Sequence, residues 1–213
     1  MEQRVRSDLA DAHALSLVHV ASPGATLTAE RRVQVGHVAR AAYLDADPPP
    51  PWVRPFGDLT FDVGHRLARH AGTITQQWYE QILKEGMDAL EWVEIVGVVV
   101  ATVPVVAFAR AIGSPIPVMA VVADGPPTGR IAHPLATATL NWVPVAAPAD
   151  QVASVVQALS ALPDEWSNLW RLASAQYMSD AQMADPLWNR GTLSRAQMEL
   201  VAARISLVRE CFF

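Results

Sequence analysis

The feature that most constrains the fold is an apolar run of fifteen residues, IVGVVVATVPVVAFA, at positions 95–109. Glu94 precedes this run, and Arg110 follows it. A helix that spans a bilayer needs about 20 apolar residues, and this run is shorter and contains Gly97 and Pro104. It therefore predicts a buried core helix, with no membrane as partner, which Pro104 should bend or break near its middle.

Composition narrows the class of protein further. With 213 residues, of which 51% are hydrophobic, the chain can bury one large core or two small ones. The net charge of -5, with no basic cluster longer than ERR, argues against nucleic acid as a partner. The N-terminus MEQRVRSDLADAH lacks the apolar core of a signal peptide, and a single cysteine excludes an internal disulfide framework. A cytoplasmic location is predicted.

Proline and glycine divide the chain into helical blocks. Four successive prolines at 48–51 cannot continue a helix and predict a stiff connector. Strand alternation is scarce throughout, so the predicted fold class is all-α. The blocks with helical character are residues 26–46, 59–72, 73–86, 87–113, 149–162, 163–178 and 194–208.

Several residues have the character of helix caps. Thr73 or Thr75 can cap one N-terminus, and Gly86 and Gly113 suit the position after a helix end. Two pairs match the capping-box pattern, in which two side chains satisfy backbone N–H groups reciprocally: Asp88 with Glu91, and Ser194 with Gln197.

Residues 114–148 are rich in proline, glycine and small residues and show no helical period. Connections of this length are uncommon in compact domains unless they cover a site or an interface. The segment is therefore a lid or clasp candidate.

The chain also contains a candidate internal repeat. Placing Glu94 over Glu199 aligns EIVGVVVATVPVVAF with ELVAARISLVRECFF, at an offset of 105 residues. The alignment predicts a duplication with a degenerate N-terminal half at 1–125, a Pro/Gly-rich connection at 126–148 and an incomplete C-terminal half at 149–213. The alternative is the general similarity of any two amphipathic helices.

The last block predicts a helix that packs through one apolar stripe. Arg195 and Glu199 lie off the centre of this stripe and, four residues apart, could pair on the surface. On this interpretation Glu199 is a solvated charge and Cys211 a small hydrophobic residue. The stripe consists of Met198, Val201, Ala202, Ile205, Val208 and Phe212.

The spacing of Glu199 and Cys211, twelve positions apart in LSRAQMELVAARISLVRECFF, supports a second interpretation. This stretch resembles the alkylhydroperoxidase D and carboxymuconolactone decarboxylase superfamily, whose motif is a glutamate, eleven residues, a cysteine, two residues, a second cysteine, three residues and a histidine. ALEWVEIVGVVVATVPVVAFARAIG is similar to the cysteine-free half of double-length members. The resemblance covers about half of the chain and implies an alkylhydroperoxidase D-like helical fold.

The resemblance implies a thiol-dependent peroxidase or disulfide oxidoreductase, with Cys211 in the redox pair and Glu199 as proton-relay acid. The second cysteine and the histidine would fall at 214 and 218, after Phe213. In one straight helix Glu199 and Cys211 would be about 18 Å apart, so the family's site needs a second helix folded back. The chain as given is therefore expected to be inactive, as a fragment, a natural truncation or an accidental likeness.

Two other functions remain open: a carboxymuconolactone-type decarboxylase, whose family members dispense with the cysteine pair, and a non-catalytic helical oligomerisation module. Peroxide or another small molecule, a thiol or disulfide reductant protein and a second copy of the chain are the expected partners. No cofactor or metal is predicted. His65 and His70, five residues apart, should lie about 140° apart around a helix and be surface or capping residues.

Overall fold

The computed structural model describes residues 5–132, 135–137, 141–146 and 154–208. The chain divides into two compact units, Met1–Leu172 and Ala173–Phe213, and is predominantly helical, as the sequence predicts. The elements of the first unit are α1 (Ser7–Val20), α2 (Ala29–Leu44), α3 (Leu59–His70), the short 3-10 helix η1 (Ala71–Thr73), α4 (Gln76–Lys84), α5 (Ala89–Ala111), β1 (Leu135–Thr137), β2 (Pro144–Ala146), α6 (Ser154–Gln157) and α7 (Pro163–Gln176), which continues past the boundary.

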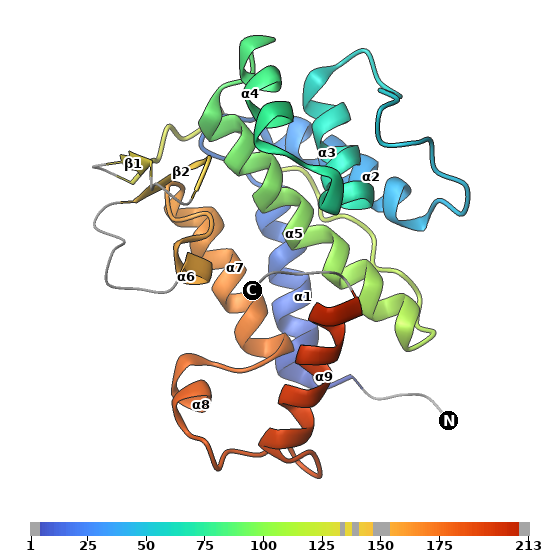
Figure 1. The fold of residues 1–213 in the computed structure, drawn as a ribbon, viewed down its shortest axis with the longest axis vertical. Coiled ribbons are helices and arrows are strands. Elements are labelled where there is room, and N and C mark those ends of the chain that lie inside the picture. Colours follow the sequence, from blue (N-terminus) through green and yellow to red (C-terminus); the bar gives the residue numbers. More distant parts are fainter. Residues whose placement is uncertain (1–4, 133–134, 138–140, 147–153, 209–213) are drawn as a thin grey trace. The chain divides into compact units, whose positions relative to one another are not determined.

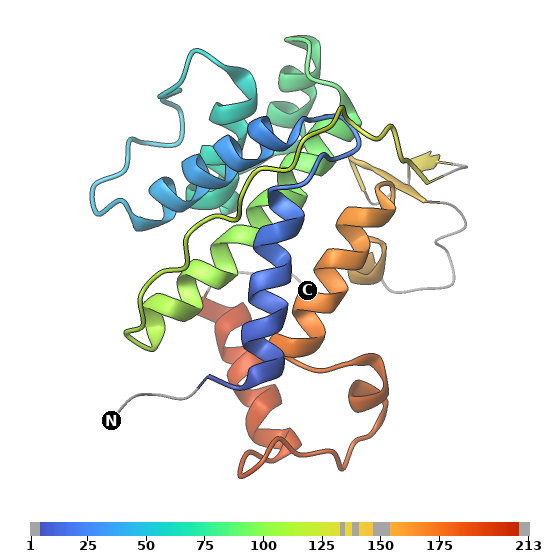
Figure 2. The same ribbon diagram turned by 180° about the vertical axis from the view of Figure 1, so that it is seen from behind.

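Helix α5 is the core helix of the first unit, as the apolar run predicts. Helices α1, α2 and α3 pack against it, and α1 lies between α5 and α7 in both views (Figures 1 and 2). By length and composition α5 could cross a membrane, but 67% of its apolar window is buried inside the structure, which is typical of a core helix in a soluble protein. Of the predicted bend or break at Pro104, the break is wrong, because the helix continues through this residue.

Most of the predicted caps are confirmed. The Thr75 hydroxyl accepts from Trp78 N and starts α4, and the Asp88 carboxylate accepts from the second and third N–H groups of α5. Gly86 and Gly113 follow α4 and α5 with φ of +111° and +67°, a conformation that favours glycine. These boundaries were predictable because each depends on residues within one turn of the helix end.

The connection after α5 is only partly irregular. Its first part runs over the first unit without regular structure and is fixed by backbone hydrogen bonds: Ala123 N donates to Ala21 O at 2.8 Å, and Thr128 N to Gly24 O at 2.7 Å. Strands β1 and β2 then pair antiparallel, with Ala136 opposite Val145. The attached part of the segment has the form of a clasp over the loop between α1 and α2.

Helix α1 is an element that the sequence reasoning did not identify. The sequence predicts no helix at residues 1–13, whose charges of both signs and missing apolar core argue only against a signal peptide. In the structure its buried face includes Leu9, Leu17 and Val20, together with the polar residues His13 and Ser16.

The second unit contains α8 (Asp180–Ala184) and α9 (Arg195–Val208). The predicted Ser194–Gln197 capping box is confirmed: each side chain accepts from the other residue's backbone N–H, at 2.9 and 3.3 Å. Of the predicted apolar stripe, Met198 is buried, whereas Val201, Ile205 and Val208 are exposed to 58, 59 and 68%. Most of the described stripe is therefore exposed on α9.

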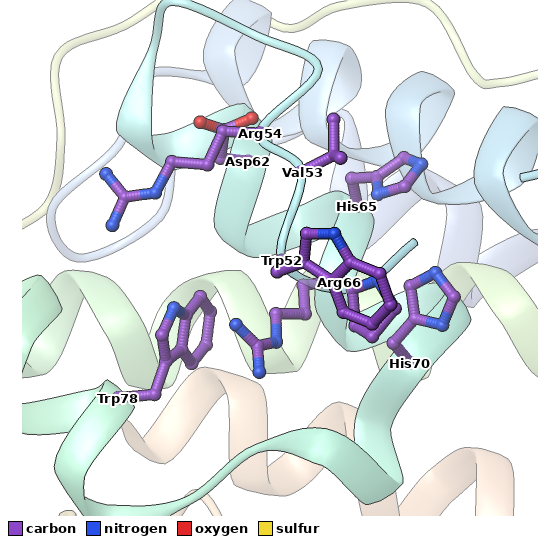
Figure 3. Close-up of a pocket in the computed structure, with 9 residues that line it drawn as sticks. Trp52, Val53, Arg54, Asp62, His65, Arg66, His70 and Trp78 are labelled. Atoms are coloured by element: carbon purple, nitrogen blue, oxygen red, sulfur yellow. The ribbon is translucent and has the colours of Figure 1, made fainter. Parts of the chain in front are cut away.

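His65 and His70 line one pocket at the side of α3 (Figure 3). The prediction of a surface or capping role is wrong for His65, which is buried, and the two ring centroids are 6.3 Å apart. His70 is the last residue of α3, and its Nε2 lies 2.9 Å from Pro49 O, so this nitrogen carries the proton. The described residues contain no group of three side chains that could hold a metal ion.

Candidate functional site

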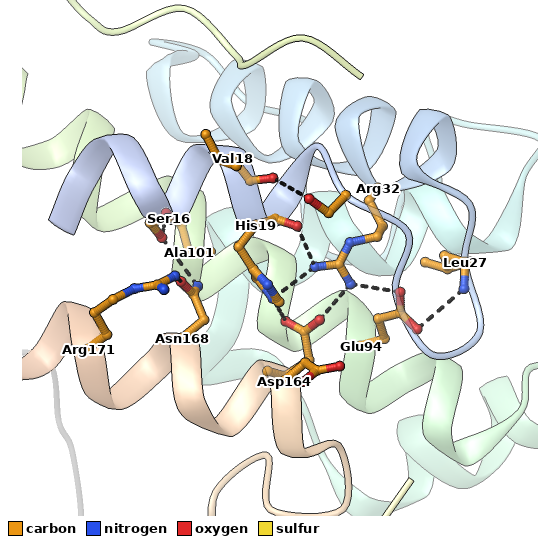
Figure 4. Close-up of polar contacts among 12 residues, drawn as sticks. Ser16, Val18, His19, Leu27, Arg32, Glu94, Ala101, Asp164, Asn168 and Arg171 are labelled. Carbon is orange, nitrogen blue, oxygen red and sulfur yellow. Dashed lines mark hydrogen bonds and ion pairs between the residues drawn. The ribbon is translucent and has the colours of Figure 1, made fainter. Parts of the chain in front are cut away.

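Four helices of the first unit bring together a buried network of charged side chains (Figure 4). Arg32 comes from α2, Glu94 from α5, Glu165 from α7 and His19 from α1. Arg32 Nη1 donates to Glu94 Oε1 at 2.7 Å and to Glu165 Oε1 at 2.6 Å. Both ion pairs lie away from water, because the side chains of Arg32 and Glu94 are 0% exposed and that of Glu165 is 3% exposed.

Glu94 has a structural role in this network. Its Oε2 accepts from the Thr26 amide at 2.6 Å, from the Thr26 hydroxyl at 2.7 Å and from the Leu27 amide at 3.3 Å. The carboxylate thus satisfies donors of the loop between α1 and α2 while it pairs with Arg32. Gly24 leaves room for it, since a Cβ at this glycine would lie 1.7 Å from Glu94 Oε1.

Glu165 connects the buried network to a histidine. Its Oε2 lies 3.0 Å from His19 Nε2, and Arg32 Nη2 donates to the His19 carbonyl at 3.2 Å. His19 Nε2 also lies 3.0 Å from Arg32 Nη2, and because a guanidinium only donates, this ring nitrogen faces one acceptor and one donor. Burial raises the pKa of Glu165, but the charge of Arg32 and the hydrogen bond from His19 outweigh burial, so the pKa lies below its ordinary value.

The buried charges are unequal in number. Two carboxylates face one guanidinium in a region where an uncompensated charge is costly. His19 Nε2 lies 3.0 Å from one of these carboxylates, so the imidazole is the candidate for proton transfer in this network.

His19 is the member of the network that reaches the surface. Its side chain is 16% exposed and lines a polar hollow of about 330 Å³. Arg130 and Arg171 lie on the wall of this hollow, together with Ser22 and Ser167. The hollow thus combines a histidine backed by a buried carboxylate with two cations.

A chain of hydrogen bonds positions one of these cations. The Ser16 hydroxyl donates to Ala101 O at 3.1 Å, Asn168 Nδ2 donates to Ser16 Oγ at 3.3 Å, and Arg171 Nη2 donates to Asn168 Oδ1 at 2.5 Å. Arg130 instead pairs with Asp164 at 3.0 Å, and both side chains are largely exposed. Arg171 is therefore held by the fold, whereas Arg130 can move.

Gly97 in α5 gives a direct test of how tightly Glu165 is held. A Cβ at this position would lie 2.2 Å from Glu165 Oε2 and 2.8 Å from its Cδ. Gly97→Ala should lower the free energy of unfolding by about 1–3 kcal/mol, despite the higher helix propensity of alanine, because Glu165 cannot move without losing its partners. Thermal unfolding measures the effect. Gly72→Ala is the matched control, since nothing lies within 4 Å of its Cβ, and equal stability of the two variants would contradict this account.

The site predicted from the sequence is not this one. Glu199 lies on the surface of α9 in the second unit, where Arg195 Nε donates to its Oε1 at 2.6 Å, as the surface interpretation predicts. The Tyr177 hydroxyl and Arg195 lower the pKa of Glu199, which makes it a poor proton donor near neutral pH. Cys211 lies outside the described residues. The structure therefore leaves the pairing of Glu199 with Cys211 a prediction.

The two glutamates aligned by the candidate repeat have opposite environments. Glu94 is completely buried among donors, whereas the Glu199 side chain is 46% exposed. The duplication itself stays a prediction.

The sequence reasoning missed His19, Arg32 and Glu165. The sequence does contain a signal for Arg32: it lies close to the apolar residues Val33 and Val35, on a helix that packs against the core. A charge at such a position needs a buried partner of opposite sign. No local pattern indicates which carboxylate that partner is.

Comparisons with known proteins identify no relative: no protein-family model, no curated protein and no solved structure matches this chain. The superfamily resemblance therefore rests on the residues quoted for it.

Proposed function

We propose that the first unit binds a small organic carboxylate in the polar hollow and that His19 exchanges a proton with it, as in the decarboxylase branch of the superfamily that the sequence resembles. The observation that carries the proposal is the distance of 3.0 Å between His19 Nε2 and the buried Glu165 Oε2, at a hollow lined by Arg130 and Arg171. The thiol is not needed for this chemistry.

The two arginines supply the binding energy for an anion. Arg171 is fixed through Asn168 and can form a charge-assisted hydrogen bond with a substrate carboxylate. Arg130 pairs with Asp164 in an exposed position, and pairs of this kind contribute little to stability, so a substrate can replace Asp164 at small cost. The hollow, at about 330 Å³, suits a compact molecule such as a lactone acid.

The proposed reaction is the loss of CO₂ from such an acid. The bond between the carboxylate and the neighbouring carbon breaks, its electron pair stays on the carbon chain, and His19 supplies the proton that this carbon takes up. Glu165 stays ionised because its pKa is lowered, and it orients the imidazole through the contact of 3.0 Å with Nε2. Water then returns a proton to His19, so the reaction consumes one proton and needs no electron donor.

His19→Gln tests the proposal. The purified full chain should release CO₂ from at least one member of a panel of lactone carboxylates, and His19→Gln should lower kcat by about 100-fold or more, because the proton donor is lost. His37→Gln on α2 is the matched control, since His37 is exposed and lies outside the network. Circular dichroism verifies that the variants are folded. No CO₂ from any lactone acid, or equal kcat in the two variants, would refute the proposal.

The same preparation tests the thiol mechanism, which the spacing of Glu199 and Cys211 favours. With an added thiol as electron donor, reduction of organic hydroperoxides by the chain that is lost in Cys211→Ser and retained in His19→Gln would support a peroxidase in place of the decarboxylase.

A further inference from the structure

A second cavity, lined by the proline-rich connector, α3 and α4, combines aromatic and cationic side chains (Figure 3). It has a volume of about 240 Å³. Trp52 and Arg54 come from the proline-rich connector, His65 and Arg66 from α3, and Trp78 from α4. Neither the predicted sites nor the proposed decarboxylation uses any of these residues.

Arg66 is the cation of this cavity that lacks a carboxylate partner. Its guanidinium carbon lies 4.1 Å from the centre of the Trp78 ring, Nη2 donates to Thr73 O at 2.7 Å, and Nε donates to Thr73 Oγ1 at 3.2 Å. Among the described residues, Nη1 has no hydrogen-bond partner. Arg66 also forms no ion pair with any of them. Burial and the neighbouring charge of Arg54 lower the pKa of Arg66, so an anion would relieve an unfavourable environment.

The other charged groups of the cavity already have partners. Arg54 Nη1 donates to Glu85 at 2.5 Å, and Asp62 Oδ1 accepts from the Phe56 amide at 2.8 Å. His70 donates to Pro49 O, and burial lowers the pKa of His65, which keeps this ring neutral. Arg66 is thus the group that offers charge to a ligand, and Asp62 disfavours a second negative charge.

Two indole rings provide surfaces for a flat apolar group. Trp78 is held in place by edge-to-face packing on the buried Trp92, with centroids 5.5 Å apart. Trp52 is 80% exposed and follows directly after the stiff run of prolines at 48–51. Such high exposure is unusual for tryptophan, because its large surface normally contributes to packing or to an interface. In Figure 3 Trp52 lies on the side of Arg66 that faces His70.

From this arrangement we propose that the cavity binds a small aromatic monocarboxylate, with the ring against Trp52 and the carboxylate on Arg66 Nη1. The volume of about 240 Å³ accommodates one ring with one acidic group. The carboxylate would accept a charge-assisted hydrogen bond, and the ring would cover the exposed indole face. This binding is independent of the proposed reaction at His19.

Benzoate is the probe for this site. Benzoate is titrated into the full chain, and binding is measured by calorimetry and by the NMR signal of the Trp52 indole N–H. We expect saturable binding at one site. That signal is assigned with Trp52→Phe. Cyclohexanecarboxylate, which lacks the aromatic ring, and benzyl alcohol, which lacks the charge, should each bind about tenfold more weakly or worse.

Arg66→Gln should weaken benzoate binding by about tenfold or more, whereas Arg69→Gln, an exposed neighbour on α3, should leave it unchanged. Trp52→Leu gives a second test, because this exposed side chain can be replaced without disturbing the core. Arg130→Gln, which alters the hollow at His19, should leave the affinity for benzoate unchanged and so distinguishes the two sites. Failure of benzoate to shift the Trp52 signal, or equal affinity in Arg66→Gln and Arg69→Gln, would overturn the proposal.

Discussion

Arg32→Met should lower the free energy of unfolding by about 3–5 kcal/mol, the cost of leaving a buried ion pair without one partner. The substitution leaves Glu94 and Glu165 facing each other in the interior with no guanidinium between them. For a unit of this size the loss corresponds to a decrease in Tm of roughly 6–20 °C. Thermal and denaturant unfolding measure it.

The neighbouring arginine provides the control. Arg31 pairs with Asp58 at 2.7 Å, but both side chains are about one third exposed, so Arg31→Met should cost about 1 kcal/mol or less. The double variant Arg32→Met, Glu165→Gln should recover part of the loss, because it removes one of the uncompensated charges. Equal losses for Arg31→Met and Arg32→Met would show that the buried network does not stabilise the first unit.

Glu94→Gln and Glu199→Gln should differ by about 3 kcal/mol or more in their effect on unfolding, although the candidate repeat aligns the two glutamates. Glu94 accepts from Arg32 and from three donors of the loop after α1, and the neutral amide replaces a buried charge in this position. Glu199→Gln removes the charge of an exposed pair with Arg195, worth a few tenths of a kcal/mol, and the amide oxygen can still accept from the Tyr177 hydroxyl.

Chemical denaturation of both variants, with the wild type, checks this difference. A large loss in Glu199→Gln would show that α9 depends on this carboxylate and would revive its proposed role in a site. A negligible loss in Glu94→Gln would mean that the loop donors tolerate a neutral acceptor.

The parts of the fold that could be predicted are those that short stretches of sequence determine. The core helix, the cap at Thr75 and the stop at Gly113 each follow from residues within a few positions. Helix α1 escaped prediction because its charges obscured its apolar face. The passage of α5 through Pro104 depends on the packing around it, which sequence periodicity does not describe.

The candidate site could not be predicted in the same way. Its components, Arg32 and Glu165, are 133 positions apart, and only the packing of α7 near α2 and α5 brings them together. Glu94 was interpreted as the boundary of the apolar run and as one member of a repeat. In the structure it is one turn inside α5 and completely buried.

The distance in sequence between Arg32 and Glu165 also determines the order in which the first unit can form. During synthesis Arg32 and Glu94 emerge early and can close a pair without net charge, well before α7 is made. Contacts between residues far apart in the chain form slowly, because a long loop must be closed first. We therefore expect the step that adds Glu165 to follow the pairing of Arg32 with Glu94, and the same step completes the support of His19.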